Sequence, residues 1–254
     1  MNPELSVIMP AIRSERWSGV YESLRAAYSK PFELIIIGPT EPTKELMDAG
    51  DVRYVRDMGS PIRCQQIGFL VSRGKYVMWA LDDGIFAPTT IDIAERMMGP
   101  KVAVMSKYEE GSGNTSHMHR DDYYYLSNHD DSRSLLLPNH YLGGHGPTIM
   151  NQSDLIAIGG WDCRYETCSI GYMDLAVRLQ NNGISIKLCD QIMVRFGHMP
   201  GTSGDHGPMH YAQLENDEPL FRKIYGDPNT SNRTAVSMGN YLNSPVVWER
   251  RFKK

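Results

Sequence analysis

The sequence predicts a single α/β domain in which a mostly parallel central sheet is flanked by helices. Over residues 1–105, short apolar runs alternate with amphipathic segments. The runs are apolar throughout, as in Phe32 to Ile37, which is typical of strands buried on both faces. Three of the runs stop abruptly at a proline, a glycine or an aspartate. Alternation of this kind favours parallel strands joined by right-handed crossovers.

The strands are identified from the apolar runs and from the residues that end them. Pro10 follows the first run, Gly38 the second, and Asp82-Asp83 the run that begins at Tyr76. Proline cannot donate a ladder hydrogen bond, and glycine and aspartate are typical of turns. In order, strands are predicted over residues 5–9, 32–37, 52–55, 76–81, 102–105, 148–150, 184–188 and 192–196.

The helices are identified from apolar side chains spaced three or four residues apart. Val20, Leu24 and Ala27 share one face of the first predicted helix, and Gly183 is a helix stop signal. In order, helices are predicted over residues 17–28, 44–49, 62–72, 91–98, 153–158 and 173–181, with a mostly polar helical region over 211–225 that is interrupted at Pro219.

Two segments differ in character from the rest. Residues 106–140 are polar and lack periodicity, which predicts a functional loop or an insertion. Within it, His117 and His119 have a spacing that could bind a metal, or they simply face water. Residues 199–208 are rich in glycine and proline and are predicted to be mobile.

Composition excludes several classes of protein. The chain of 254 residues is 41% hydrophobic and has a net charge of −4, which gives no case for nucleic-acid binding. No apolar run approaches the ~20 residues of a membrane span, and the N-terminus lacks the basic region of a signal peptide. The four cysteines form no CxxC pair. We therefore expect reduced thiols in a cytoplasmic protein.

The pair Asp82-Asp83 is the strongest candidate for chemistry. Adjacent carboxylates at the end of a buried strand repel each other unless a cation or hydrogen-bond donors hold them. Ligands of open α/β sheets lie just outside the carboxyl ends of the strands. A divalent cation shared with a phosphate-bearing ligand would suit this place. The alternative is an ordinary Asp-Gly turn at Asp83-Gly84. No GxGxxG or GxxxxGK sequence follows the first strand, which argues against a dinucleotide fold or a P-loop.

The order of these elements resembles the family 2 glycosyltransferases, which have the Rossmann-like GT-A fold. The resemblance covers residues 5 to about 200. Its most specific parts are the strand ending in Asp82-Asp83 and the later combination of Gly159-Gly160-Trp161-Asp162 with Asp174-Leu175 and Arg178-Leu179. The resemblance implies a nucleotide-sugar donor half over residues 1–105, an acceptor half over 141–225 and a C-terminal tail over 226–254.

The family's DxD motif holds Mn²⁺ or Mg²⁺ on the diphosphate of the donor, where the cation stabilises the leaving charge. The motif is incomplete in this chain. The resemblance implies that Asp83 is the direct metal ligand and that Asp82 contacts sugar or ribose hydroxyls, with Asp82 a second candidate ligand. His198 resembles a further metal ligand of the family, and the alternative is a surface histidine.

The family's general base is missing from its usual place. The positions of the usual Glu-Asp pair hold Gly171 and Tyr172. Asp174 is then the first candidate base, because a helix N-terminus favours its ionised form, and Glu166 is the second. The alternative is that Asp174 only caps its helix.

The family's donor and acceptor contacts are also altered. Gly38-Pro39-Thr40 replaces an aspartate that often contacts the base, and Pro10-Ala11-Ile12-Arg13 replaces the usual loop. Arg13, Arg63 and Gln66 are candidates to contact the base or the phosphates, or they are solvated polar residues. Trp161 is a candidate platform for a sugar face, with Asp162 beside it in the acceptor half.

We therefore expect a metal-dependent, inverting glycosyltransferase that moves a sugar, from a UDP-sugar in the favoured case, to a hydroxyl of a carbohydrate or lipid-linked acceptor. The alternatives are a sugar nucleotidyltransferase and an inactive relative that binds nucleotides or sugars. The basic, aromatic residues 248–254 could touch an anionic membrane surface, although a solvated, frayed terminus is the favoured interpretation.

Overall fold

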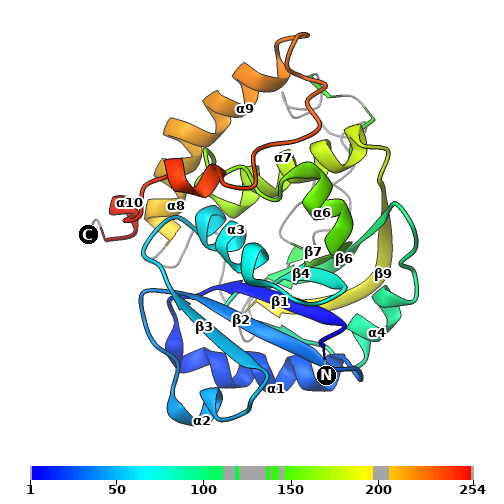
Figure 1. The fold of residues 1–254 in the computed structure, drawn as a ribbon, viewed down its shortest axis with the longest axis vertical. Helices are drawn as coiled ribbons and strands as arrows, with labels where there is room; N and C mark the ends of the chain where they lie inside the picture. The colour runs from blue at the N-terminus through cyan, green and yellow to red at the C-terminus, as the bar shows by residue number, and fades with distance from the viewer. Residues whose placement is uncertain are drawn as a thin grey trace.

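The computed structural model describes residues 2–110, 118–119, 136–137, 139–142, 146–196 and 206–252. Its strands form one sheet with the order β3-β2-β1-β4-β8-β6-β9-β5, and β7 pairs with β6 (Figure 1). The strands are β1 Leu5–Pro10, β2 Phe32–Gly38, β3 Val52–Arg56, β4 Tyr76–Trp79, β5 Gly84–Phe86, β6 Val102–Glu110, β7 Met118–His119, β8 Thr148–Asn151 and β9 Ser185–Phe196.

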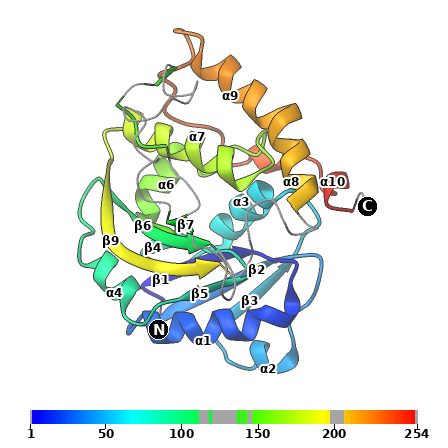
Figure 2. The same cartoon turned by 180° about the vertical axis from the view of Figure 1, so that it is seen from behind.

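Helices cover both faces of this sheet. Helices α1 and α2 lie against one face, whereas α3, α6 and α7 lie against the other, with α9 outside α7 (Figures 1 and 2). The helices are α1 Trp17–Ala27, α2 Lys44–Met47, α3 Pro61–Val71, α4 Thr90–Glu95, α6 Gln152–Ile158, α7 Cys168–Asn181, α8 His206–Ala212, α9 Glu218–Tyr225 and α10 Glu249–Phe252. Among the described residues, no helix has the length and apolarity needed to cross a membrane.

The predicted fold class is confirmed. Strands β3, β2, β1 and β4 are mutually parallel, and β6 runs parallel to β9, whereas β8 and β5 run antiparallel to their neighbours. All of Phe32–Gly38 is buried because helices cover both faces of β2. The parallel order places the carboxyl ends of β1 to β4 along one edge, which we call the donor edge.

Two strand predictions need correction. Strand β6 continues to Glu110, five residues into the predicted loop 106–140, because it pairs with β9 along its length. The two strands predicted over 184–188 and 192–196 are the single strand β9, with irregular pairing opposite Ser106 to Tyr108. His117, most of the predicted loop, and residues 199–205 lie outside the described residues.

Two helix predictions also need correction. Helix α7 begins at Cys168, five residues before the predicted start at 173. Pro219 does not interrupt the helical region after α8. It stands in the first turn of α9, directly after a π-helical turn over Gln213–Asp217. Proline is tolerated there because the first N–H groups of a helix need no intrahelical acceptor.

The predicted turn after α6 depends on two glycines. Gly159 and Gly160 have φ values of 78° and 74°, a region that favours glycine. A Cβ on Gly160 would lie 2.1 Å from Oε1 of Gln66 in α3. The close approach lets the backbone N–H of Trp161 donate to the same oxygen at 2.8 Å. This hydrogen bond therefore connects the turn after α6 to α3.

The first testable prediction concerns Gly160. Gly160→Ala should lower the free energy of unfolding by about 3 kcal/mol or more, because backbone strain and overpacking add. Gly183 is the matched control, because its φ is 73° but no atom lies within 4 Å of its added Cβ. Gly183→Ala should cost only the strain, about 1–2 kcal/mol. Urea unfolding measures both, and equal losses would contradict the packing argument.

Candidate functional site

Asp82 links two strands at the donor edge. The residue is 3% exposed. Its Oδ2 accepts hydrogen bonds from the backbone N–H groups of Ile12 at 2.6 Å and Arg13 at 2.7 Å. The Arg13 guanidinium donates to Oδ1. The end of β4 is therefore fixed to the loop after β1, and the predicted donor residues Asp82 and Arg13 are in direct contact.

Asp83 is the second carboxylate of the donor edge. Its side chain is fully buried, and Oδ2 lies 3.6 Å from the Arg16 guanidinium. Arg16 ends the short 3₁₀ helix Ser14–Arg16, which follows β1. The loop after β1 thus supplies a guanidinium to each carboxylate, and this compensates the repulsion between the two adjacent negative charges.

A divalent cation fits Asp83 better than Asp82. Asp82 already accepts three hydrogen bonds, so a metal there would compete with Arg13. Asp83 offers the hard oxygen ligands that Mg²⁺ and Mn²⁺ prefer, and such cations often use one or two carboxylates plus substrate phosphates. No group of three or more His, Cys, Asp or Glu side chains that could hold a metal occurs in the described part of the chain. His198 lies outside it.

Three further predicted donor residues meet at this edge. The backbone N–H of Ala11 donates to Ile37 at 2.8 Å, which pairs the loop after Pro10 with the end of β2. A Cβ on Gly38 would lie only 1.9 Å from the Ala11 carbonyl oxygen. Glycine is therefore required where β2 ends. Pro10, Ala11 and Gly38 come together beside Arg13.

Arg63 and Gln66 have structural roles instead, because both bond other parts of the chain. Gln66 is completely buried, and its amide donates to the carbonyl oxygens of Gly159 and Met238. Arg63 is 7% exposed and pairs with Asp57 at 3.1 Å. The same guanidinium bonds the carbonyl of Tyr241. The expectation that Gln66 reads the donor is wrong because no ligand reaches a buried, fully bonded amide, and Arg63 is engaged in the same way.

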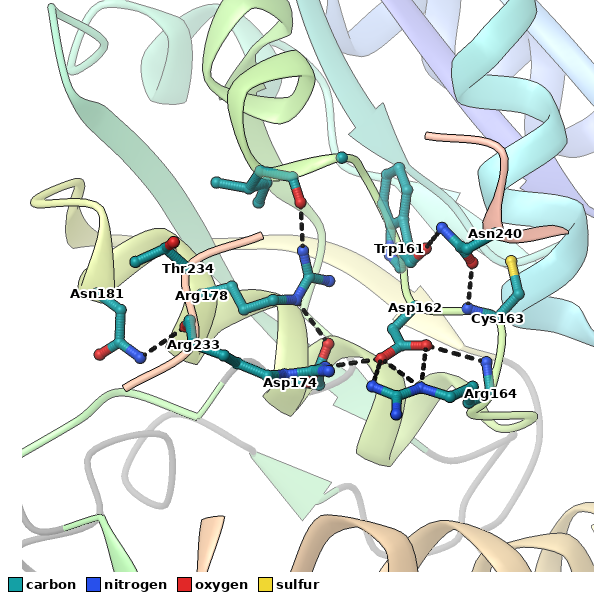
Figure 3. A network of polar contacts seen from close by, with 12 residues as sticks. Trp161, Asp162, Cys163, Arg164, Asp174, Arg178, Asn181, Arg233, Thr234 and Asn240 are labelled. Atoms are coloured by element: carbon teal, nitrogen blue, oxygen red, sulfur yellow. Dashed lines mark hydrogen bonds and ion pairs between the residues drawn. The ribbon is translucent and has the colours of Figure 1, made fainter. Parts of the chain in front are cut away.

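The predicted acceptor residues also lie in the core. Trp161 is 0% exposed and packs edge-on against Phe69, with ring centroids 6.1 Å apart. No face of its ring is open to a sugar, so the platform expectation is wrong. Asp162 is 1% exposed and pairs with Arg164 and Arg233, both at 2.7 Å (Figure 3).

Asp174 belongs to the same buried ion network. It is 0% exposed and pairs with Arg178 at 2.9 Å. Its other oxygen accepts from Tyr225 at 2.7 Å and contacts Arg233 (Figure 3). Asp174 stands two turns into α7 rather than at its start, so neither the helix-cap alternative nor the dipole argument applies. The general-base expectation fails because no acceptor hydroxyl reaches this carboxylate.

Glu166 holds the end of the chain. Its carboxylate accepts from the Arg250 guanidinium and from Trp248 Nε1 at 3.2 Å. Trp248 is 5% exposed, and its backbone N–H donates to Met58 at 2.7 Å. The C-terminal segment, residues 226–252, is therefore packed down at its far end, and the expectation of a frayed terminus is wrong for its described part.

Sequence reasoning missed the cluster that positions the N-terminus of α7. Tyr172 is buried and stacks on Trp79 with ring centroids 4.3 Å apart. Its hydroxyl accepts from Gln65 at 2.9 Å. Asp217 accepts the backbone N–H groups of Glu166 and Thr167 at 3.0 and 2.8 Å. No local signal links residues fifty positions apart, so only the fold reveals these contacts before α7.

The four cysteines are buried and unpaired, in agreement with the expectation of reduced thiols. Burial raises the pKa of the Cys64 thiol to about 12 and that of Cys168 to about 11. Thiols with such values remain protonated near neutral pH, and this excludes them as nucleophiles.

The second testable prediction concerns the pH dependence of stability. Burial alone would raise the pKa of Asp162, but the hydrogen bond from Arg164 and the charges of Arg233 and Arg164 outweigh it and lower the pKa from 3.8 to about 2. The resulting stability, about 2 kcal/mol, is present above pH 4 and is lost as the pH falls towards 2.

Asp162→Asn should therefore lower the free energy of unfolding by about 2 kcal/mol at pH 6. The difference from the wild type should shrink between pH 4 and 2 in urea unfolding. Asp190→Asn is the control, because the Asp190 side chain is 88% exposed. A difference for Asp162→Asn that stays constant with pH would contradict the assignment.

Comparison with solved structures finds proteins of the same fold, among them the glycosyltransferase TarS of S. aureus. No family model matches the chain, and no curated protein matches its sequence. The structure of S. aureus TarS 1–349 matches with a TM-score of 0.53 and 15% identity over 76% of this chain and 60% of that one. Its complex with UDP-GlcNAc matches with a TM-score of 0.55 and 15% identity over 87% and 70%.

The longer TarS structure matches with a TM-score of 0.56 and 14% identity over 93% of this chain and 44% of that one. The chain thus spans about 60% of the length of the TarS 1–349 structure. TarS 1–349 is also known in complex with UDP. At this level of identity the likeness concerns the fold alone: the chain is built on the Rossmann-like fold of a glycosyltransferase.

Proposed function

We propose that this protein is a glycosyltransferase that moves a sugar from a nucleotide-sugar donor, a UDP-sugar in the favoured case, to a hydroxyl acceptor. The observation that carries the proposal is the donor edge. There the buried carboxylates of Asp82 and Asp83 follow the parallel strand β4 and pair with Arg13 and Arg16. The shared fold with TarS, which is known with UDP and UDP-GlcNAc, supports the donor class.

The donor edge has the charges that departure of a diphosphate needs. The leaving group gains negative charge as the bond to the sugar breaks, and preorganised positive groups stabilise it. Arg13 and Arg16 belong to the short segment after β1, which places their guanidinium groups next to the two aspartates. We assign Mn²⁺ or Mg²⁺ to Asp83, where the cation would supply further positive charge to the same phosphates.

Inverting transfer needs a base for the acceptor hydroxyl. Of the candidate carboxylates, Asp174 is fully buried, whereas the Glu166 side chain is 17% exposed. Glu166 therefore remains our candidate base, with Arg250 orienting it. The acceptor is a carbohydrate or a lipid-linked sugar, and its contacts lie outside the buried pair Trp161 and Asp162.

An inactive nucleotide-sugar-binding relative is the second candidate. The observation that favours it is the replacement of the family's acidic pair by Gly171 and Tyr172. The Tyr172 hydroxyl is buried, and burial raises its pKa well above 10, so it is a poor base. This candidate predicts donor binding without turnover.

The third testable prediction concerns donor binding. UDP with Mn²⁺, at 100 times its Kd, should stabilise the protein by about 2.7 kcal/mol, which raises Tm by roughly 5–10 °C. Asp83→Asn should remove the Mn²⁺-dependent part of this shift. Asp48→Asn, at an exposed position in the first half of the chain, is the control. A shift that is unchanged in Asp83→Asn would contradict the metal assignment, and no shift with any nucleotide would contradict the donor class.

The fourth prediction concerns turnover. The wild type should release UDP from its UDP-sugar in a coupled assay, and Asp83→Asn should lower kcat/KM about 100-fold or more. Asp48→Asn should leave the rate unchanged. Donor binding by the wild type without any release of UDP would favour the inactive relative.

A further inference from the structure

The two arginines of the donor edge are held in different ways. The Arg13 guanidinium bonds Asp82, and the backbone N–H groups of Ile12 and Arg13 bond the same carboxylate. The Arg13 side chain is 21% exposed. The Arg16 guanidinium instead lies 3.6 Å from Oδ2 of Asp83, which is longer than a charged hydrogen bond, and its side chain is 44% exposed. Arg16 is therefore the more loosely held of the two arginines.

The backbone of Arg16 is fixed even though its side chain is nearly half exposed. The Arg16 N–H donates to the carbonyl of Arg13 at 3.0 Å, and the next residue, Trp17, is 1% exposed. The Arg16 side chain also lies 3.7 Å from Glu15, whose side chain is 70% exposed. The guanidinium can therefore rotate away from Asp83 while the helix that follows stays in place.

Asp83 needs a positive charge beside it. Its side chain is fully buried, and the carboxylate of Asp82 next to it is buried as well. An ionised carboxylate in such a place is stable only when a positive group or hydrogen-bond donors compensate it. Arg16 supplies a positive charge at the carboxylate to which we assign Mn²⁺ or Mg²⁺. Because like charges repel, Arg16 and a divalent cation compete for Asp83.

We propose that Arg16 exchanges partners as the donor site fills: it pairs with Asp83 in the free protein and with the diphosphate of the nucleotide sugar in the loaded protein. The inference rests on the proposed function, from which it takes the divalent cation and the diphosphate. Asp83 then lies beside a positive group in both states. Arg13 stays with Asp82, because three hydrogen bonds hold that carboxylate to the segment after β1.

This exchange couples the two ligands of the donor site. Without a nucleotide, Arg16 loses its partner when a cation takes Asp83. With UDP bound, Arg16 already lies at the phosphates and leaves Asp83 free to accept the cation. Each ligand therefore strengthens the binding of the other, by the same factor in both directions. Removal of the Arg16 guanidinium should abolish this part of the coupling.

The test measures the affinity for Mn²⁺ by titration, without UDP and with saturating UDP. Without UDP, Arg16→Gln should bind Mn²⁺ about fivefold more tightly than the wild type or better, because its competitor for a buried carboxylate is gone. With saturating UDP, the two affinities should agree within about twofold, because Arg16 has already left Asp83 in the wild type. Arg16→Lys keeps the charge and should stay closer to the wild type in both titrations.

Arg25→Gln is the matched control. Arg25 lies in the last turn of α1, at the opposite end from Arg16, and its side chain is 56% exposed and 4.0 Å from Asp51. The variant thus removes the same charge and another loose ion pair. It should change the Mn²⁺ affinity by less than about twofold in both titrations. The ligand-free Tm of each variant verifies that it is folded.

The second half of the exchange is tested with UDP and with uridine, which lacks the phosphates. With Mn²⁺ present, Arg16→Gln should bind UDP about 10- to 100-fold more weakly than the wild type, because a charged contact with the phosphates is lost. The affinity for uridine should be equal in the two proteins. An unchanged affinity for UDP, or equal losses for UDP and uridine, would overturn the proposal.

The Mn²⁺ titrations also separate this proposal from the proposed function. An affinity of Arg16→Gln for Mn²⁺ that is not increased without UDP would overturn the exchange, as would an increase of equal size with and without UDP. If the wild type binds UDP but no Mn²⁺, the exchange fails and the donor class stands. If the wild type binds no UDP, the proposed function fails before any variant is compared.

Discussion

The buried ion network around Asp174 is the interaction on which the second half of the molecule depends. Asp174 and Asp162 share Arg233, and Arg178 joins Asp174 to the carbonyl of Ile158 (Figure 3). Removing Asp174 would leave the fully buried Arg178 side chain without its ion-pair partner, at a cost of about 3–5 kcal/mol. The network therefore fixes α6, α7 and the C-terminal segment as one unit.

This unit is joined to the parallel strands through α7. The Tyr172 ring stacks on Trp79 at the end of β4, and Asp217, in a π-helical turn, accepts the backbone N–H groups of the two residues directly before α7. Asp82 follows Trp79 by three residues and is bonded in turn to the loop after β1. Helix α7 and strand β4 thus connect the buried network to the donor edge.

Several residues that resemble catalytic or binding groups are structural because of where the chain buries them. Asp174, Trp161 and Gln66 are all completely buried. Carboxylates, indoles and amides serve equally well as core partners and as ligands, and their type and spacing do not reveal which. Burial without a partner is costly, so the polar groups of Asp174 and Gln66 are bonded to matched donors and acceptors. Those partners, such as Arg233 and Met238, are distant in the sequence.

The sequence by itself determined the fold class, the order of most strands and helices, and the position of Asp82-Asp83 at a strand end. These follow from local causes: continuous apolar runs, helical spacing, and turn residues next to each run. Only the tertiary structure decided that Asp82 is bonded to the loop after β1 and that Asp174 is a core residue. Such facts depend on contacts between residues 51 to 70 positions apart. No local pattern encodes them, because burial and pairing are set by the packing of the whole chain.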